Sequence, residues 1–411
     1  MAPTVQLSRE EAIGLVTRWL VEGRLAEAEA LLQQLEQTLP GDYEAAFLSG
    51  QLALARKDYS AAATIFRRLL TRDPTLLRVR LDLARALFLA GDYDAARYHF
   101  ERALGQHLPE TARQTVYLYL QRIETETSWL SVTVVVGPDS NPSYASSAET
   151  VDILGQPFVL SSEAQARKAT GVTALVQARH SFGAENRGLA RAYLEMREFP
   201  GTYADYHYAQ ATVGANSVRG NHVWTAEAGP LGALYQDATL YVGGLIQLGH
   251  TSPVTPRLLA SQSLTVKRLE YRDYDYLSAD ETWLAGQLRY ALSAATGVSL
   301  ALSAGRNDTA QSEYSYDALD GAIGFDAELA RRFNLDVRVG YARYRYDSPS
   351  TLFGQVRNDR LLRLDLNVVA RDWAMRGFAP LLTAGYARND STISLLDYRR
   401  HYFGLGVTRS F

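Results

Sequence analysis

Side chains that could carry chemistry occur throughout this chain, but none follows the spacing of a known catalytic or metal-binding motif. There is no HExxH, GxSxG, phosphate-binding loop or CxxC, and the seven histidines are scattered without ligand spacing. The absence of cysteine removes thiolate metal sites, Cys nucleophiles and disulfides. We therefore expect no enzyme activity, no cofactor and no metal site.

Two short patterns have candidate spacing and a simpler explanation. The acidic run within residues 273–281 offers carboxylates that suit Ca²⁺, but an acidic run in a loop is more commonly a solvated surface. Gly404 and Gly406 form a GxG inside a segment of alternating residues, where glycine indicates packing within a strand and not nucleotide binding.

Composition limits the classes of protein that remain. The 42 Lys and Arg residues balance 45 Asp and Glu residues, so nucleic acid is not an expected partner. No run of about 18 apolar residues exists, which excludes a spanning helix but not a barrel, whose strands need only about ten alternating residues. The initial stretch APTVQLSREEA carries no signal peptide, so either the protein stays in the cytoplasm or the numbering starts at a mature chain.

A repeat of 34 residues organises the first part of the chain. KDYSAAATIFRRLLTRDP at 57–74 and GDYDAARYHFERALGQHLP at 91–109 match at several positions, and a weaker copy precedes them. Helix pairs with this period are typical of tetratricopeptide repeats. Ala28, Ala62 and Ala96 are small where the two helices of a repeat must approach each other. We predict repeats at 9–40, 43–74 and 77–109, with a capping helix at 111–126.

Such arrays bind peptides or proteins in a concave groove lined by the first helix of each repeat. By repeat position, nine residues would line this groove: Glu10, Ile13, Thr17, Glu44, Phe47, Gln51, Arg78, Leu81 and Arg85. For any one of them the alternative is a solvated helix face. For the array as a whole, a client-binding groove is the better interpretation.

After residue 127 the hydrophobic period changes from 3.6 to 2. In NLDVRVGYARY (334–344) and LLRLDLNVVAR (361–371), apolar residues alternate with charged ones. A membrane barrel would place the charged face in its lumen. We count fourteen strands, an even number, and short connections mostly alternate with long ones. This predicts a repeat domain at 1–127 and a fourteen-stranded antiparallel outer-membrane barrel at 128–411.

The predicted lumen would contain charged side chains from several strands. They are Arg191, Glu195, Arg197, Asp336, Arg338, Arg363 and Asp365. They either guide a polar client or pair with one another, and pairing is the favoured interpretation.

The closing stretch HYFGLGVTRSF places Phe403, Leu405, Val407 and Phe411 on one face. A last strand ending in phenylalanine resembles the C-terminal signal by which outer-membrane barrels are handed to their assembly machinery, although Arg409 departs from that pattern. The first and last strands would pair to close the barrel. If the barrel opens laterally, we therefore expect it to open between these two strands.

GPDSN at 137–141 follows the first predicted strand. Pro138, Asp139, Ser140 and Asn141 are turn formers, because Asp, Ser and Asn bond their own backbone and proline presets a turn. The start of a loop is therefore the simplest interpretation of this motif.

The repeats, GPDSN and the closing segment 377–411, in this order, resemble the surface lipoprotein assembly modulator (Slam) family. The resemblance implies a Gram-negative outer-membrane protein that moves client lipoproteins, or soluble relatives, to the cell surface, with its repeats in the periplasm engaging the client. Its partners would be the client, outer-membrane lipids and the barrel-assembly machinery, and we expect a monomer. The rivals are an exopolysaccharide export pore, which aromatic platforms in the lumen would favour, and a soluble adaptor.

Overall fold

The computed structural model describes residues 7–125, 127–162, 164–183, 187–293, 295–329 and 333–410. The chain forms two compact units, Met1–Ala112 and Arg113–Phe411, and each is considered by itself. The domain boundary after residue 127 stays a prediction. Within the described ranges, no helix is long and apolar enough to cross a membrane.

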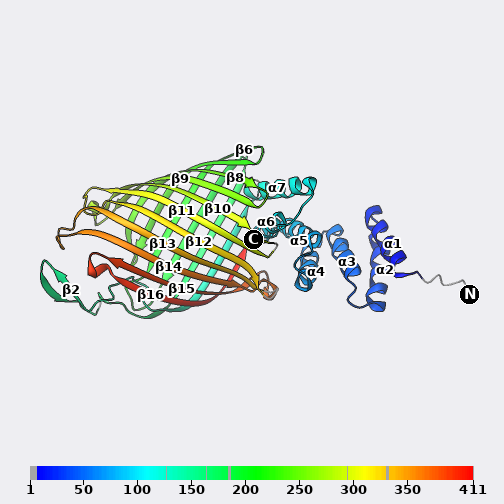
Figure 1. The fold of residues 1–411 in the computed structure, drawn as a ribbon, viewed down its shortest axis with the longest axis horizontal. Coiled ribbons are helices and arrows are strands. Elements are labelled where there is room, and N and C mark those ends of the chain that lie inside the picture. The colour runs from blue at the N-terminus through cyan, green and yellow to red at the C-terminus, as the bar shows by residue number, and fades with distance from the viewer. Residues whose placement is uncertain are drawn as a thin grey trace, which may run out of the picture. The chain divides into compact units, whose positions relative to one another are not determined.

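The first unit consists of paired antiparallel helices (Figure 1). In chain order the helices are α1 (Arg9–Glu22), α2 (Leu25–Thr38), α3 (Tyr43–Ala55), α4 (Tyr59–Arg72), α5 (Leu77–Leu89) and α6 (Tyr93–Leu104). The next helix, α7 (Glu110–Thr125), belongs mostly to the second unit. The predicted tetratricopeptide helix pairs are confirmed. The repeated aspartates are N-caps, since Asp58 and Asp92 accept hydrogen bonds from the backbone N–H of Ala61 and Ala95 at 3.0 and 3.2 Å.

Small residues let these helices pack closely. Ala28, Ala62 and Ala96 are completely buried, as their repeat positions predict. Gly50 serves the same purpose, because a Cβ at this position would lie 2.4 Å from the ring of Phe66, far inside van der Waals contact. The helical core is thus built from an alanine or glycine facing a large side chain.

The second unit is a closed antiparallel barrel of fourteen strands (Figure 1), which confirms the predicted fold class. Its strands are β1 (Trp129–Asp139), β4 (Ala169–Phe182), β5 (Gly188–Glu198), β6 (Tyr206–Arg219), β7 (His222–Tyr235), β8 (Ala238–Thr255), β9 (Leu258–Tyr271), β10 (Ala279–Ala291), β11 (Thr296–Thr309), β12 (Tyr316–Leu329), β13 (Phe333–Pro349), β14 (Val356–Val369), β15 (Ala379–Ser391) and β16 (Tyr398–Ser410). β1 pairs with β4 on one side and with β16 on the other. The barrel therefore has no open sheet edge.

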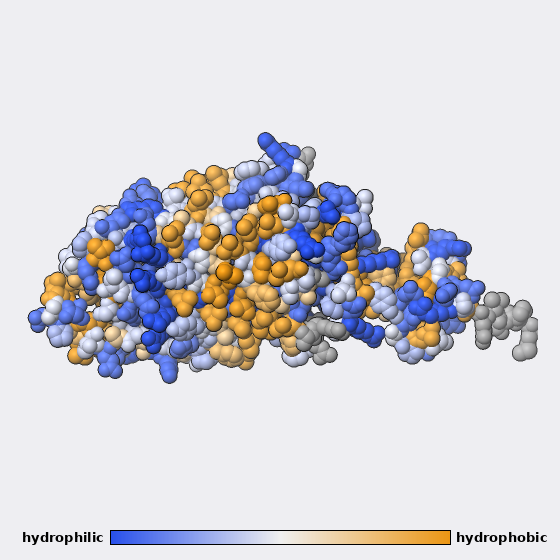
Figure 2. All heavy atoms as spheres, viewed as in Figure 1, coloured by the Kyte–Doolittle hydropathy of each residue, from blue (hydrophilic) through white to orange (hydrophobic). Residues whose placement is uncertain are grey.

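The outer wall of the barrel is apolar around its middle. Leu284, Leu302, Leu319, Ile323 and Leu405 are all more than half exposed on outward-facing positions. Figure 2 shows hydrophobic residues, in orange, as a band across the wall. An exposed apolar band of this kind fits a lipid surround.

Two connections differ from the sequence-based expectation. HTSPVTP at 250–256 has the turn-forming composition of a connection, but β8 continues through it to Thr255. β7 and β8 are joined at the long-loop end by a tight turn at Gln236 and Asp237, both with positive φ (50° and 61°).

The connection between β1 and β4 contains a hairpin that the sequence did not predict. It consists of β2 (Thr150–Ile153) and β3 (Gln156–Val159), and Leu154 and Gly155 turn with positive φ. Short 3₁₀ helices also lie in loops: η2 (Asp275–Leu277), η3 (Arg371–Trp373) and η4 (Ser394–Leu396).

Candidate functional site

A cluster of aromatic and charged side chains lies between α3 and α5, the first helices of the second and third repeats. The Arg78 guanidinium lies over the Phe47 ring, 4.7 Å from its centroid, and Tyr43 stacks beside Phe47 at 6.5 Å. Gln51 donates a hydrogen bond from Nε2 to Asp82 at 2.6 Å. Burial raises the pKa of Asp82 above its ordinary value, against the lowering effect of Arg78.

The cluster brings together three of the nine predicted groove residues, Phe47, Gln51 and Arg78. Tyr43 and Asp82 were not among the predicted positions, although each lies four residues from a predicted position on the same helix and therefore on the same face. The Phe47 ring is 7% exposed and belongs to the helical core, so the surface itself offers the Tyr43 ring, the Arg78 guanidinium and the half-buried Asp82 carboxylate. It can bind a segment that combines an apolar side chain with polar or charged groups.

Of the other predicted groove residues, Arg85 also acts on Asp82, whose pKa it lowers against the effect of burial. Glu44 pairs with Arg9 at 2.9 Å, and the Thr17 hydroxyl donates to the carbonyl of Ile13 at 2.8 Å. Glu10 and Arg85 are exposed and Leu81 is half-buried. Groove binding by these positions stays a prediction.

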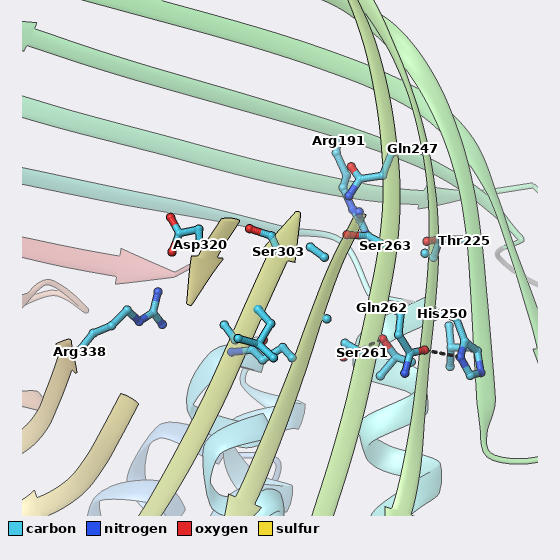
Figure 3. A pocket seen from close by; sticks show the side chains of 18 residues that line it. Arg191, Thr225, Gln247, His250, Ser261, Gln262, Ser263, Ser303, Asp320 and Arg338 are labelled. Atoms are coloured by element: carbon cyan, nitrogen blue, oxygen red, sulfur yellow. Dashed lines mark hydrogen bonds between the residues drawn. The ribbon is translucent and has the colours of Figure 1, made fainter. Parts of the chain in front are cut away.

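One lumen cavity, of about 440 Å³, is lined mainly by small polar residues of β7 to β12 (Figure 3). Thr225, Gln247, Ser263 and Ser303 contribute hydroxyl and amide groups to this wall. Arg191 pairs with Glu227, which is almost fully buried, at 2.5 Å. A lining of this kind can accommodate water and polar chain segments.

A second lumen cavity, of about 490 Å³, lies where the first and last strands meet. Tyr144, from the loop after β1, lines it together with Arg197 and Arg400. The Arg400 guanidinium lies 4.6 Å from the Tyr144 ring centroid and 4.9 Å from that of Tyr402. Arg197 donates to the Tyr144 hydroxyl at 3.3 Å and pairs with Glu195 at 2.6 Å.

The GPDSN motif fastens the end of β1 to β16. Nε and Nη2 of Arg400 lie 2.8 and 2.7 Å from one carboxylate oxygen of Asp139. Ser140 and His401 exchange two hydrogen bonds, from the Ser140 N–H to the His401 carbonyl at 2.9 Å and from the His401 N–H to Oγ of Ser140 at 2.8 Å. Asn141 is completely buried and donates to the carbonyl of Arg399 at 3.3 Å. The motif therefore contacts the last strand as well as beginning a loop.

The four motif residues do not contribute equally. Pro138 is exposed and lacks an N–H, and the β1–β16 ladder is interrupted between Val136 and Asp139. Asp139 restores the pairing opposite Tyr402. A functional role for the motif beyond this structural contact stays a prediction.

The residues expected to form the assembly signal lie on the outward face of β16. Phe403, Leu405 and Val407 are exposed on that face, and Phe411 lies outside the described residues.

Several predicted lumen charges do pair. Besides the pairs of Arg191 and Arg197, Arg363 pairs with Asp320, and Asp365 accepts a hydrogen bond from the Tyr402 hydroxyl at 2.5 Å.

Tyrosines line the half of the lumen near the long loops. Tyr193 and Tyr208 meet edge to face with ring centroids 5.7 Å apart, and the Tyr206 and Tyr241 hydroxyls are 3.3 Å apart. Similar ring contacts join Tyr241 to Tyr271, and Tyr316 to Tyr344 and Tyr346. The sequence signal was the YxY spacing on inward positions, in YHY at 206–208 and YRY at 344–346.

In the part of the chain that the structure describes, no three His, Asp or Glu side chains gather as metal ligands would. The acidic run at 273–281 is divided between a loop with η2 and the start of β10.

Sequence comparison identifies the family. Tetratricopeptide repeat profiles match residues 20–76 and 53–114, and the profile described as "Surface lipoprotein assembly modifier" matches residues 206–411, half of the chain. The chain belongs to the surface lipoprotein assembly modifier family. The predicted resemblance is therefore confirmed. This family, together with the apolar band of the barrel, places the protein in the outer membrane.

The family assignment agrees with one curated relative. A protein of Moraxella catarrhalis described as "Surface lipoprotein assembly modifier" is 32% identical over 114 residues, which are 27% of this chain and 22% of that protein. An Escherichia coli O157:H7 protein named for the cellulose synthase operon, protein C, is 35% identical over 92 residues, 22% of this chain and 8% of that protein. These alignments thus span less than a quarter of either relative.

Solved porin structures also align with the chain. A KdgM porin in complex with oligogalacturonate aligns over 68% of this chain and 99% of its own, at 7% identity and a TM-score of 0.32. An anion-selective porin of Comamonas acidovorans aligns over 69% and 99%, at 10% identity and a TM-score of 0.36.

Proposed function

We propose that this protein delivers client lipoproteins, or soluble relatives of them, across the outer membrane to the cell surface. The observation that carries the proposal is the family match over residues 206–411, which fall within the closed barrel. The polar cavity among β7 to β12 supports it, because a client segment in the lumen needs polar partners along its path.

The helical repeats are proposed to engage the client in the periplasm. β1 starts at the barrel end that carries the short turns, and in barrels of this class that end faces the periplasm. The chain before β1 therefore begins on that side. The cluster of Tyr43, Phe47, Gln51, Arg78 and Asp82 is the proposed centre of the client-binding groove, with the remaining predicted groove residues extending it along the array.

An assay of lipoprotein exposure tests both parts of the proposal. The chain, supplied with a signal peptide, is co-expressed with a candidate lipoprotein in a Gram-negative host, and protease accessibility of the lipoprotein is measured on intact cells. We expect exposure with the native chain and at least a severalfold loss with Arg78→Ala. Arg68→Ala, an exposed arginine on α4 outside the cluster, is the matched control.

Two outcomes would contradict the proposal. A folded barrel with no lipoprotein exposure for any candidate would refute delivery. Full exposure with Arg78→Ala would refute the groove while leaving delivery standing. A version lacking residues 1–126 then shows whether the repeats are needed at all.

The proposal includes no catalytic step. We propose a monomer embedded in outer-membrane lipids. The barrel-assembly machinery would recognise the C-terminal signal formed by Phe403, Leu405, Val407 and Phe411.

An exopolysaccharide export pore is the second candidate, and the tyrosine-lined lumen favours it, as does the likeness to the cellulose synthase operon protein. Sugar stacking needs open ring faces. Tyr193 and Tyr208, and likewise Tyr316 and Tyr344, instead meet edge to face, which argues against this candidate. Restored polysaccharide secretion in a host that lacks its own export pore would establish this candidate and displace the first.

A further inference from the structure

The outward face of β13 to β16 carries a band of arginines near the long-loop end of the barrel. The band is defined by Arg343 and Arg345 on β13, Arg360 on β14, Arg388 on β15 and Arg399 on β16. Their positions alternate with inward-facing residues such as Tyr344, Asp359 and Arg400, so the side chains leave the barrel on its outer wall. All but Arg343 are exposed, and Arg343 is half-buried.

The strand register places like charges opposite each other within this band. Arg343 is paired with Arg360, and Arg388 with Arg399. Opposite residues of an antiparallel pair have Cβ atoms roughly 5 Å apart, and like charges there are destabilising. A sheet that keeps two such pairs needs an anion from elsewhere to offset the repulsion.

Few carboxylates of the protein itself pair with the arginines of this band. Asp390 lies opposite Arg360 but bonds to Arg388, at 2.9 Å. Among the residues that the structure describes, Arg343, Arg345, Arg360 and Arg399 form no side-chain hydrogen bond or ion pair. Nε of Arg343 is both buried and without a partner.

At the same end of the wall, an arginine on a nearby strand has several carboxylate partners, so the lack of partners is local to the arginine band. Arg306 on β11 lies 2.5 Å from Asp347 and 3.1 Å from Asp308, with Asp317 at 3.6 Å. Three carboxylates thus surround Arg306. Asp347 is itself on β13 and Asp317 lies opposite Arg345 in the register, so the uncompensated positive charge is centred on Arg343, Arg360 and Arg399.

The arginine band lies directly beside the apolar band. Along the same outward faces the next residues are Tyr341 and Val339 after Arg343, Leu362 after Arg360, and, beyond His401, Phe403 after Arg399. Figure 2 shows this junction as a blue band between the orange band and the loop end that carries β2. Because the long-loop end of such barrels faces outward, the guanidinium groups lie where the acyl chains of the outer leaflet meet its headgroups.

We propose that the arginine band binds the phosphates of a phosphorylated glycolipid of the outer leaflet, of the lipid A class. The planar guanidinium forms paired hydrogen bonds with phosphate oxygens, and two phosphates would neutralise Arg343, Arg360 and Arg399, whereas Arg388 already pairs with Asp390. The acyl chains of the same molecule would lie against Val339, Leu362 and Phe403. A lipid of this class fits because its phosphates match the arginine band and its acyl chains match the apolar band beside it.

The test uses the purified full-length chain in dodecyl maltoside and measures binding of bisphosphorylated lipid A by native mass spectrometry. The triple variant Arg343→Gln/Arg360→Gln/Arg399→Gln should bind roughly 10- to 100-fold more weakly, since each interfacial cation contributes to attraction of anionic lipid. The corresponding triple lysine variant keeps the charge but loses the paired hydrogen bonds, so it should bind more weakly than the native chain and more tightly than the Gln variant. Arg268→Gln, an exposed outward arginine on β9, is the matched control and should bind as the native chain does.

The lipid probes and a folding check make the result decisive. Monophosphorylated lipid A should bind more weakly than the bisphosphorylated form. Equal binding by the native chain and the triple Gln variant would overturn the proposal. Equal affinity for phosphatidylglycerol would overturn the assignment to lipid A, because it would mean general attraction of anionic headgroups. If heat-modifiability on gels shows that the triple variant is unfolded, Arg399→Gln alone, at an exposed site, gives the same comparison.

Discussion

Arg400 on the last strand directs Nε and Nη2 to a single oxygen of Asp139 at the end of the first strand, at 2.8 and 2.7 Å. The Asp139 side chain is 2% exposed and that of Arg400 is 15% exposed. The other Asp139 oxygen accepts the Asn141 N–H at 2.9 Å. The barrel is thus closed by a nearly buried ion pair between residues 261 positions apart.

Asp139→Asn is expected to destabilise the barrel strongly. The change leaves a mostly buried Arg400 without its carboxylate, and breaking a buried pair from one side costs about 3–5 kcal/mol. Urea unfolding of the purified protein in detergent, followed by the loss of heat-modifiable migration, measures the effect. Glu270→Gln removes an exposed carboxylate 3.9 Å from Arg268, and should change stability by less than about 1 kcal/mol. Equal urea midpoints for both variants would contradict the prediction.

Gly50→Ala is expected to destabilise the helical unit. The added Cβ would lie 2.4 Å from the buried Phe66 ring, which must move at a cost of roughly 1–3 kcal/mol. Gly14→Ala in α1 is the control, since nothing lies within 4 Å of its Cβ position, and there alanine should stabilise by about 0.5–1 kcal/mol. Far-ultraviolet circular dichroism during urea unfolding compares the two. The packing argument fails if both variants shift the midpoint in the same direction.

Asp82 is expected to give the helical unit a pH-dependent stability. Burial raises its folded-state pKa above 3.8, so between the two values the folded chain binds more protons than the unfolded chain. The contribution is fully present below 3.8 and is lost as the pH rises through the raised value. The difference in urea midpoint between the native chain and Asp82→Asn measures it, because Arg78, Arg85 and Gln51 are common to both. A difference that does not change between pH 3.5 and 7 would refute the shift.

Both parts of the fold could be predicted because each is encoded by a local period. The aspartates that recur every 34 residues are helix N-caps, and Ala28, Ala62 and Ala96 recur where helices touch. In the barrel, alternation of apolar and polar residues reports which side of a strand faces lipid. These signals depend only on neighbours in sequence.

The sites were less predictable because they depend on register between distant segments. No local pattern pairs Asp139 with Arg400, or places Arg343 opposite Arg360, before the strands are aligned. The tight turn at Gln236 and Asp237 was not predicted either, since neither residue is the glycine that usually indicates positive φ. In the helical unit, Asp82 was overlooked because its partner Gln51 belongs to the preceding repeat.

A disulfide across the closing seam tests whether the barrel opens there during delivery. Thr133 and Thr408 face each other on β1 and β16 with their hydroxyls 2.9 Å apart, and the native chain contains no cysteine. If clients leave through the seam, oxidised Thr133→Cys/Thr408→Cys should abolish lipoprotein exposure and reduction should restore it. Thr251→Cys/Ser261→Cys, which replaces a similar hydroxyl pair on β8 and β9 at 3.1 Å, should not affect exposure. Undiminished exposure with a fully oxidised seam would show that clients pass through the lumen while β1 and β16 stay paired.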